Sequence, residues 1–270
     1  MLSRQMRAEF DQRGVVYLRD AFSEDAAAAM RRRVWARLAR LGVLEHDEST
    51  WAAAPVTGLN KAIRRDAVFT AAGSPAVLGA VDDLLGAGGW EPPPNWGTVM
   101  VTFPGRQRPW ALSSEGWHPD YSHLHAPEPL FGVKVFAFFA DVRPRSGGTL
   151  AIAGSHRVLA RFAQSLPPEV RRDGTRFMPL FFKHDDWFRS LSRPGGDPER
   201  AAGFMDSDHQ ADGIAVRVME LTGRPGDVVL THPWVLHCAA PNAGTYPRMM
   251  LTKNLYRRGV SLRNQADASR

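Results

Sequence analysis

The chain has 270 residues, of which 44% are hydrophobic and 23% charged, and its formal net charge is +6. This length suits one large domain or two small ones, and the composition is ordinary for a globular protein. No apolar run approaches the roughly 20 residues of a membrane span, and residues 1–10 lack the apolar core of a signal peptide. A single cysteine, Cys238, excludes an intramolecular disulfide framework, so we expect a cytoplasmic location.

The positive charge comes mainly from arginine, because only four of the 34 basic residues are lysine. We interpret the densest arginine cluster, at residues 31–40, as the solvated face of a predicted helix and not as a nucleic-acid site. A carboxylate-bearing substrate is a milder use of the same charge. We therefore expect a small-molecule substrate, with no nucleic acid or membrane as a partner.

The first 96 residues are predicted to be mostly helical. Ser23 is a good helix cap because a hydroxyl there is followed by two acidic residues, and Gly42 is a typical stop signal. Pro75 suits the first position of a later helix. This part is expected to contain helices at 3–12, 23–41 and 74–85, a strand at 15–18 and irregular chain at 43–60.

From residue 97 onward the chain is rich in β-type runs that are separated by glycine and proline turns. We expect one domain that is mainly β with helices packed outside, as in a sandwich or jelly roll. Its core is assigned to residues 97–164 and 213–258. The predicted strands are 97–103, 131–142, 149–153, 214–221, 227–232 and 248–256.

Residues 165–212 interrupt this pattern with a long, irregular, highly charged stretch that also holds several aromatic residues. Such an insertion in a compact domain is often functional, and its aromatic residues indicate that part of it packs. We interpret it as an insertion or lid over the site, with a surface excursion of no special role as the alternative.

A candidate metal site begins at His118 and Asp120, which are two residues apart. On an extended strand alternate side chains share a side, so one segment can offer an imidazole and a carboxylate to one ion. His237, at the end of the predicted strand 227–232 and its extension, supplies a distant second imidazole. Two histidines and one carboxylate on one face, with open positions, are characteristic of non-haem Fe(II) oxygenases.

Arg248 comes eleven residues after His237, across a predicted turn. A hairpin would bring these two residues close together near one mouth of the barrel. A buried arginine there needs an anion, because an unpaired buried charge is costly. Its planar guanidinium is suited to a bidentate carboxylate.

Several pieces of the sequence together resemble the phytanoyl-CoA dioxygenase family of Fe(II)- and 2-oxoglutarate-dependent oxygenases. They occur in the family's order and span most of the chain: residues 10–16, 117–120, 147–157 and 226–229, then His237, 241–242 and Arg248. The resemblance implies a double-stranded β-helix, that is, a cupin-like jelly roll. It also implies that His118, Asp120 and His237 bind Fe(II) and that Arg248 pairs with the distal carboxylate of 2-oxoglutarate.

The resemblance also suggests roles for four residues outside this set. Thr98 and Thr102 lie where relatives have polar residues that contact the co-substrate, although ordinary strand threonines are an equal alternative. Lys61 is a further candidate for positive charge. His156, in the Gly-Ser-His turn, is expected to be structural.

The implied activity consumes O2 and 2-oxoglutarate, releases succinate and CO2, and oxidises a small organic substrate. Because related halogenases replace the carboxylate with a small residue, Asp120 favours hydroxylation, or epimerisation, cyclisation or desaturation, over halogenation. The aromatic residues and the insertion favour a bulky or aromatic natural product in secondary metabolism. The alternative is a cupin-like metal-binding protein without redox turnover, and the oligomeric state stays open.

Some residues near these motifs have no settled role in the sequence. His123 and His125 are candidate extra ligands or rim residues, and Lys134 is either an edge-strand charge or a pocket cation. We expect His232 to have a structural role and Cys238 to be a buried inert thiol. Aromatic residues that line either the pocket or the plain core are Trp117, Tyr121, Phe136, Phe138 and Trp234.

Overall fold

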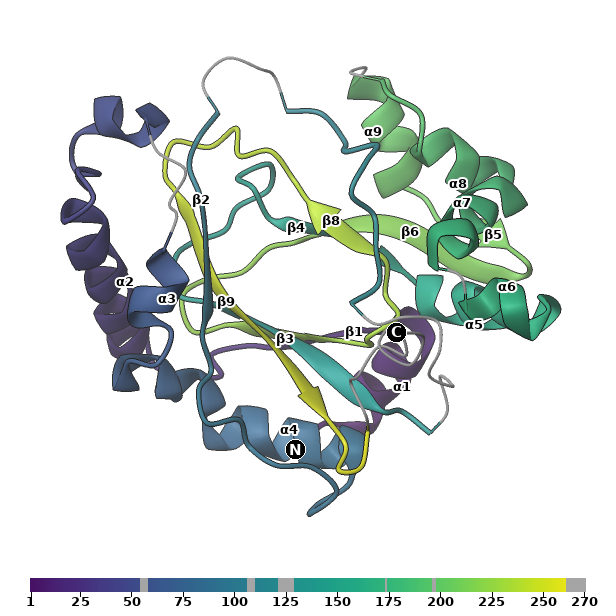
Figure 1. Cartoon of the computed structure of the whole chain (residues 1–270), viewed down its shortest axis with the longest axis horizontal. Helices are drawn as coiled ribbons and strands as arrows, with labels where there is room; N and C mark the ends of the chain where they lie inside the picture. Colours follow the sequence, from purple (N-terminus) through teal and green to yellow (C-terminus); the bar gives the residue numbers. More distant parts are fainter. Residues whose placement is uncertain (54–57, 106–109, 121–128, 173, 196–197, 261–270) are drawn as a thin grey trace, which may run out of the picture.

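The computed structural model describes residues 1–53, 58–105, 110–120, 129–172, 174–195 and 198–260. Two antiparallel β-sheets form its centre, and helices lie on both outer sides (Figure 1). The strands are β1 (Val15–Leu18), β2 (Thr98–Thr102), β3 (Gly132–Phe138), β4 (Thr149–Ala153), β5 (His209–Ala211), β6 (Ile214–Leu221), β7 (Val228–Thr231), β8 (His237–Ala239) and β9 (Arg248–Tyr256).

The strand order identifies the architecture. One sheet has the order β1-β7-β3-β9-β2 and the other β5-β6-β4-β8, and neighbouring strands in each sheet are antiparallel. From β6 to β9 consecutive strands alternate between the two sheets, as in a double-stranded β-helix. The predicted class, mainly β with packed helices in a jelly roll, is confirmed.

Alternation along the strands divides the apolar side chains into three layers. In β3, Phe136 and Phe138 face the space between the sheets and pack with Met250 and Ala151. The intervening residues, such as Val135, join a cluster with the N-terminal helices. A third cluster lies between the outer side of the smaller sheet and the helices of residues 155–205. The side chains between the sheets therefore form the only layer that a site inside the jelly roll can use.

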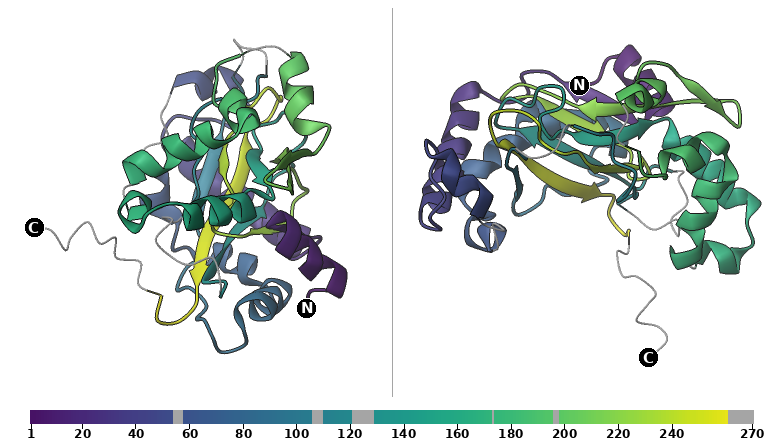
Figure 2. Two further views of the ribbon diagram at one scale, coloured as in Figure 1. Left: turned by 90° about the vertical axis from the view of Figure 1, so that its right-hand side faces the viewer. Right: turned by 90° about the horizontal axis from the view of Figure 1, so that it is seen from above.

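The N-terminal helices cover the outer side of the larger sheet (Figures 1 and 2). Ser3, Ser23 and Ser74 each accept a hydrogen bond from a backbone N–H in the first turn, as expected of caps. The region predicted as irregular contains η1 and the start of α3, so that prediction was wrong there. The helical elements are α1 (Arg4–Arg13), α2 (Glu24–Ala39), η1 (Glu48–Ala53), α3 (Leu59–Ile63), η2 (Ala67–Gly73) and α4 (Pro75–Leu85).

The segment at 165–212 is not irregular, which corrects the sequence expectation. Its aromatic residues recur at helical spacing, with charged residues between them. Phe177, Phe181 and Phe188 are fully buried against the smaller sheet. It folds into helices and the β5 strand, on the right in Figure 1. The helix α5 (Ser155–Ser165) precedes this segment. The helices within it are α6 (Pro168–Arg172), α7 (Gly174–His184), α8 (Asp186–Leu191) and α9 (Pro198–Met205).

Within the described residues, no single helix is both long and apolar enough to cross a membrane. The pair η2 and α4, bent by 51° against each other, passes that test jointly by length and composition alone. Their apolar side chains, among them Phe69, Val77 and Val81, are buried in the cluster under the larger sheet. This packing accounts for their hydrophobicity.

Candidate metal centre

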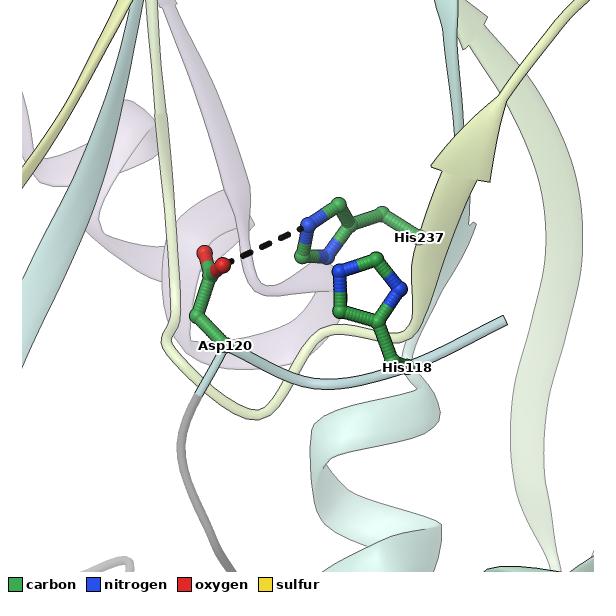
Figure 3. Close-up of side chains that lie close together, drawn as sticks. All are labelled: His118, Asp120 and His237. Atoms are coloured by element: carbon green, nitrogen blue, oxygen red, sulfur yellow. Dashed lines mark ion pairs between the residues drawn. The ribbon is translucent and has the colours of Figure 1, made fainter. Parts of the chain in front are cut away.

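His118, Asp120 and His237 come together in the folded chain, each offering one ligand atom, and these atoms lie within 4.8 Å of one another (Figure 3). The segment of His118 pairs with that of His237 as an antiparallel bridge, with backbone N···O distances of 3.1 and 3.0 Å. The Asp120 N–H donates to the carbonyl of Pro233 at 3.2 Å. Backbone pairing between two segments far apart in sequence therefore assembles the three side chains.

Both imidazoles are oriented by backbone carbonyls. Nδ1 of His118 lies 2.7 Å from the Gly116 carbonyl, and Nδ1 of His237 lies 3.0 Å from the Val235 carbonyl. A carbonyl only accepts, so Nδ1 carries the proton in each ring and Nε2 is the nitrogen with the lone pair. This is how metal-binding histidines are commonly held.

Lys134 of β3 is a fourth polar side chain beside the triad. Its Nζ lies 2.7 Å from Oδ1 and 2.5 Å from Oδ2 of Asp120, and 3.3 Å from Nε2 of His237. The side chains of Lys134 and Asp120 are only 12% and 13% exposed. The sequence left the role of Lys134 open, and the structure makes it the ion-pair partner of Asp120.

The pKa of His237 favours a neutral ligand. Burial, together with the positive charge of the nearby Lys134, lowers this pKa to about 4, although Asp120 opposes the shift. At neutral pH the ring is therefore uncharged, and its lone pair is available to a cation. Neutral imidazole is the form that binds transition metals.

The Gly-Ser-His turn at 154–156 fixes the chain just before His237. The buried hydroxyl of Ser155 accepts a hydrogen bond from the N–H of Leu236 at 2.9 Å, and the N–H of Ile152 donates to the Leu236 carbonyl at 2.8 Å. Leu236 is thus held on both sides. The sequence analysis did not predict this role of Ser155, although the residue lies within the family motif at 147–157.

Arg248 begins β9 with its side chain buried at 3% exposure. Its Nη2 donates to the hydroxyl of Thr102 on β2, while Nε and Nη1 are buried without a hydrogen-bond partner among the described residues. Burial lowers the pKa of Arg248 to about 10, so the group stays charged at neutral pH. A buried cation with free donors is suited to an incoming anion.

Thr102 is itself held in place by Asn242. The Asn242 side-chain amide donates to the carbonyls of Thr102 and Tyr246, at 2.9 Å each, and accepts from the N–H of Gly244 at 2.9 Å. These bonds tie the end of β2 to the turn that precedes Arg248. The predicted turn thereby becomes a support for the arginine.

Two other predicted residues lie elsewhere. Thr98 shares the inner face of β2 with Thr102, but it pairs with Thr252 and not with Arg248. Lys61 is exposed on α3, beside Asn60, whose amide binds the backbone of Val99. The structure therefore does not bring Lys61 to the triad. Tyr121, His123 and His125 lie outside the described residues.

His156, His232 and Cys238 belong to the packing. Nδ1 of His232 accepts from the Trp234 N–H at 3.0 Å, and the ring lies 4.7 Å from that of His156. Burial raises the pKa of the Cys238 thiol to about 12, so it is not a ready nucleophile. Among the aromatic residues, Phe136 lies near His237, with ring centroids 6.0 Å apart, while Trp117 and Trp234 pack in the outer cluster.

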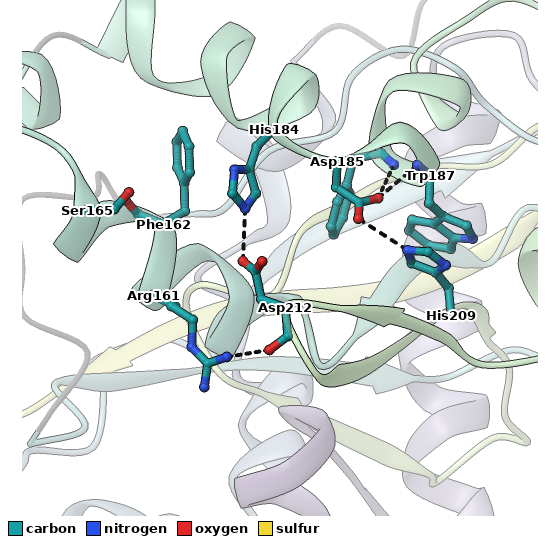
Figure 4. Close-up of polar contacts among 9 residues, drawn as sticks. Arg161, Phe162, Ser165, His184, Asp185, Trp187, His209 and Asp212 are labelled. Atoms are coloured by element: carbon teal, nitrogen blue, oxygen red, sulfur yellow. Dashed lines mark hydrogen bonds and ion pairs between the residues drawn. The ribbon is translucent and has the colours of Figure 1, made fainter.

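Polar contacts tie the inserted helices to the β5–β6 hairpin (Figure 4). His184 at the end of α7 lies 2.8 Å from Asp212, and His209 lies 3.3 Å from Asp185, the cap of α8. The rings of Trp187 and His209 stack at 5.5 Å. The insertion is therefore docked on the smaller sheet, and its role as a lid stays a prediction.

A jelly roll that gathers two imidazoles and one carboxylate, with a buried arginine at the start of β9, defines the class of non-haem Fe(II)- and 2-oxoglutarate-dependent oxygenases. The sequence matches the profile of the family described as Phytanoyl-CoA dioxygenase (PhyH) over residues 10–250. The chain belongs to this family and is an Fe(II)- and 2-oxoglutarate-dependent oxygenase. A search of curated proteins found no match.

Solved structures agree with this fold. The chain is similar to the non-haem alpha-ketoglutarate-dependent carbocyclase SnoK from nogalamycin biosynthesis, with TM-score 0.51 and 18% identity over 99% of this chain and 90% of SnoK. It is similar to the non-haem monooxygenase ThoJ, with TM-score 0.50 and 15% identity over 95% and 78% of the two chains. It is also similar to EvdO2 from Micromonospora carbonacea var. aurantiaca, with TM-score 0.50 and 16% identity over 95% of this chain and 91% of EvdO2.

Proposed function

We propose that His118, Asp120 and His237 hold the Fe(II) ion of this oxygenase and that Arg248 binds the distal carboxylate of 2-oxoglutarate. The observation that carries the proposal is the pair of buried Arg248 donors, Nε and Nη1, that have no partner among the described residues. They belong to a strand whose inner face also carries Met250, which packs against Phe136 beside His237. The donor set of two neutral imidazoles and one carboxylate fits Fe(II) with open positions.

The protein residues have distinct tasks in this scheme. When bound, the iron ion supplies the O2 chemistry that couples the conversion of 2-oxoglutarate to succinate and CO2 with substrate oxidation. Arg248 and the Thr102 hydroxyl hold the far end of the co-substrate and so orient its reacting end. Phe136, Phe138 and Met250 form an apolar layer between the two sheets, and this layer excludes water from the space beside the metal centre.

For the organic substrate we propose a small natural product. SnoK, one of the similar structures, is a carbocyclase from nogalamycin biosynthesis, which supports an assignment to secondary metabolism but names no substrate for this chain. Asp120 supplies the carboxylate ligand, which favours hydroxylation or a related oxidation over halogenation.

An anaerobic titration tests this function. The metal-free protein is mixed with Fe(II) and then with 2-oxoglutarate, and the visible spectrum is recorded. We expect a charge-transfer band that saturates with one equivalent of each, and succinate after O2 is admitted. If neither the band nor succinate forms, the chain is a metal-binding jelly roll without redox turnover.

A further inference from the structure

A polar pocket of about 230 Å³ lies at the opposite end of the inner face from Arg248. Thr98 of β2, Lys134 of β3 and the β9 residues Thr252, Lys253 and Asn254 line it. Neither the triad nor Arg248 belongs to its lining. None of these lining residues has a role in the binding of iron or 2-oxoglutarate proposed above.

Strand register separates this pocket from the arginine. Thr98 pairs with Thr252, whereas Thr102 pairs with Arg248. The two pairs are four residues apart along β2, which corresponds to about 13 Å. Met100 and Met250 form the apolar pair between them. A single 2-oxoglutarate molecule held by Arg248 therefore leaves the polar pocket at Thr98 and Thr252 free.

Lys134 connects the pocket to the metal centre. The residue lines the pocket, and its Nζ contacts both carboxylate oxygens of Asp120. Asp120 is the only acidic partner of Lys134 among the described residues. A carboxylate that also serves a divalent cation cannot neutralise a buried ammonium fully, so Lys134 retains capacity for a further anion.

The other lining groups complement an anion with a neighbouring hydrogen-bond donor. The lining holds two ammonium groups, two hydroxyls and one amide, and no carboxylate among the described residues. Oδ1 of Asn254 is buried and has no hydrogen-bond partner among the described residues. A buried acceptor of this kind needs a donor from a ligand.

We propose that this pocket binds a carboxylate group of the organic substrate, with Lys134 as the counter-ion and Asn254 Oδ1 accepting from a hydroxyl or amino group on the adjacent carbon. The substrate class is thus a hydroxy acid or amino acid, or a larger product that carries such a group. The proposal rests on the function proposed above, because it takes the triad as the place of oxidation. It makes Lys134 the residue that selects an acidic substrate.

Calorimetry on the anaerobic complex with Fe(II) and 2-oxoglutarate tests the proposal with three probes: phenylacetate, its neutral counterpart phenylethanol, and mandelate, which adds a hydroxyl beside the carboxylate. We expect the wild type to bind phenylacetate about tenfold more tightly than phenylethanol, as one charge-assisted hydrogen bond predicts. Lys134→Met should reduce this ratio to about one, and Lys134→Arg should restore most of it. Asn254→Leu should remove the further preference for mandelate over phenylacetate.

The ratio is informative because both probes meet the same metal loading, which cancels any change in iron affinity. The charge-transfer band is recorded in every variant before the probe is added. A wild type that shows the band but does not prefer phenylacetate would overturn the anion pocket and leave the oxygenase assignment intact. A preference that survives in Lys134→Met would also overturn it, since the carboxylate would then bind elsewhere. Loss of the band in the wild type would instead refute the proposed function.

Discussion

Two buried cations face the space between the sheets, and they differ in their partners. Arg248 donates to one neutral hydroxyl and has no acidic partner among the described residues, whereas Lys134 contacts both oxygens of Asp120. Both are largely hidden from water, so each charge has a high cost unless an anion compensates it. Lys134 has its anion within the protein, and Arg248 lacks one. Arg248 therefore depends wholly on a ligand for its anion, whereas Lys134 needs a ligand only to complete the charge of Asp120, which the metal would share.

The same physics applies to His156, which is buried with Nδ1 unpartnered. Burial lowers the pKa of His156 to about 4, so the ring avoids a buried charge by losing its proton. Arginine does not have this choice at neutral pH, because its pKa remains at about 10 even when buried. A buried arginine therefore marks a binding site more clearly than a buried histidine does.

The largest effect is expected at the carboxylate that joins the triad to Lys134. Asp120→Ala should weaken Fe(II) binding by more than about 100-fold, because it removes a ligand and leaves Lys134 as an uncompensated cation next to the site. Competition with a chromogenic chelator measures this affinity. Asp141→Ala, at an exposed ion pair with Arg143, is the matched control and should leave the affinity unchanged. Equal affinities in the two variants would contradict the ligand assignment.

Arg248→Met should separate binding from stability. We expect 2-oxoglutarate affinity to fall about 100-fold, as the loss of a bidentate charged pair predicts. We also expect the free energy of unfolding of the ligand-free protein to stay the same or rise, because the variant lacks a buried unpaired charge. Spectral titration and urea unfolding give the two quantities. A loss of stability with unchanged co-substrate affinity would make Arg248 a structural residue.

Lys134→Met should have the opposite sign in the same unfolding experiment. Removal of the ammonium leaves Asp120 buried without its counter-ion, so the ligand-free protein should lose about 3 kcal/mol, the low end of the range for a broken buried pair. Asp120→Asn combined with Lys134→Met should recover part of this loss. If Arg248→Met and Lys134→Met changed the unfolding free energy in the same direction, the proposed difference between an unpaired Arg248 and a paired Lys134 would be wrong.

The pH dependence tests the histidine in the same comparison. The pKa of His156 in the folded chain, about 4, is below its unfolded value near 6.5, so the unfolded state takes up a proton first as the pH falls. The stability contribution is complete above pH 6.5 and is lost between pH 6.5 and pH 4. Between pH 7 and pH 5 the loss of unfolding free energy from this histidine is about 2 kcal/mol. His156→Gln should flatten the profile of the metal-free protein only in part, because His237 shifts in the same direction.

Ser155→Ala should give the smallest effect. Loss of its hydrogen bond to the Leu236 N–H should cost about 1 kcal/mol of stability and reduce Fe(II) affinity several-fold, because the chain before His237 is then held on one side only. Ser165→Ala is a matched control, since its hydroxyl binds a helix carbonyl in α5 away from the triad. A similar loss of metal affinity in both variants would exclude a specific positioning role for Ser155.

Local patterns predicted most of the strands and the early helices. The serine caps and the glycine stops give α1, α2 and α4 within about two residues. The β-type runs between glycine and proline turns give β2, β3, β4, β6, β7 and β9. The prediction failed at 165–212, where charged residues masked a helical pattern of buried phenylalanines. The three-residue strands β5 and β8 were also missed, because so short a run depends on its neighbours and not on its own composition.

The sequence by itself determined a mainly β class of the sandwich or jelly-roll kind, the His-x-Asp segment, the distant His237 and the arginine eleven residues later. These follow from residue type and local spacing, which are properties of the chain alone. Only the tertiary structure decided that Lys134 is the partner of Asp120, that Thr98 and Thr102 lie at opposite ends of one face, and that Arg248 is buried without an anion. Those facts depend on strand register and burial, which arise from long-range pairing and cannot be read from local spacing.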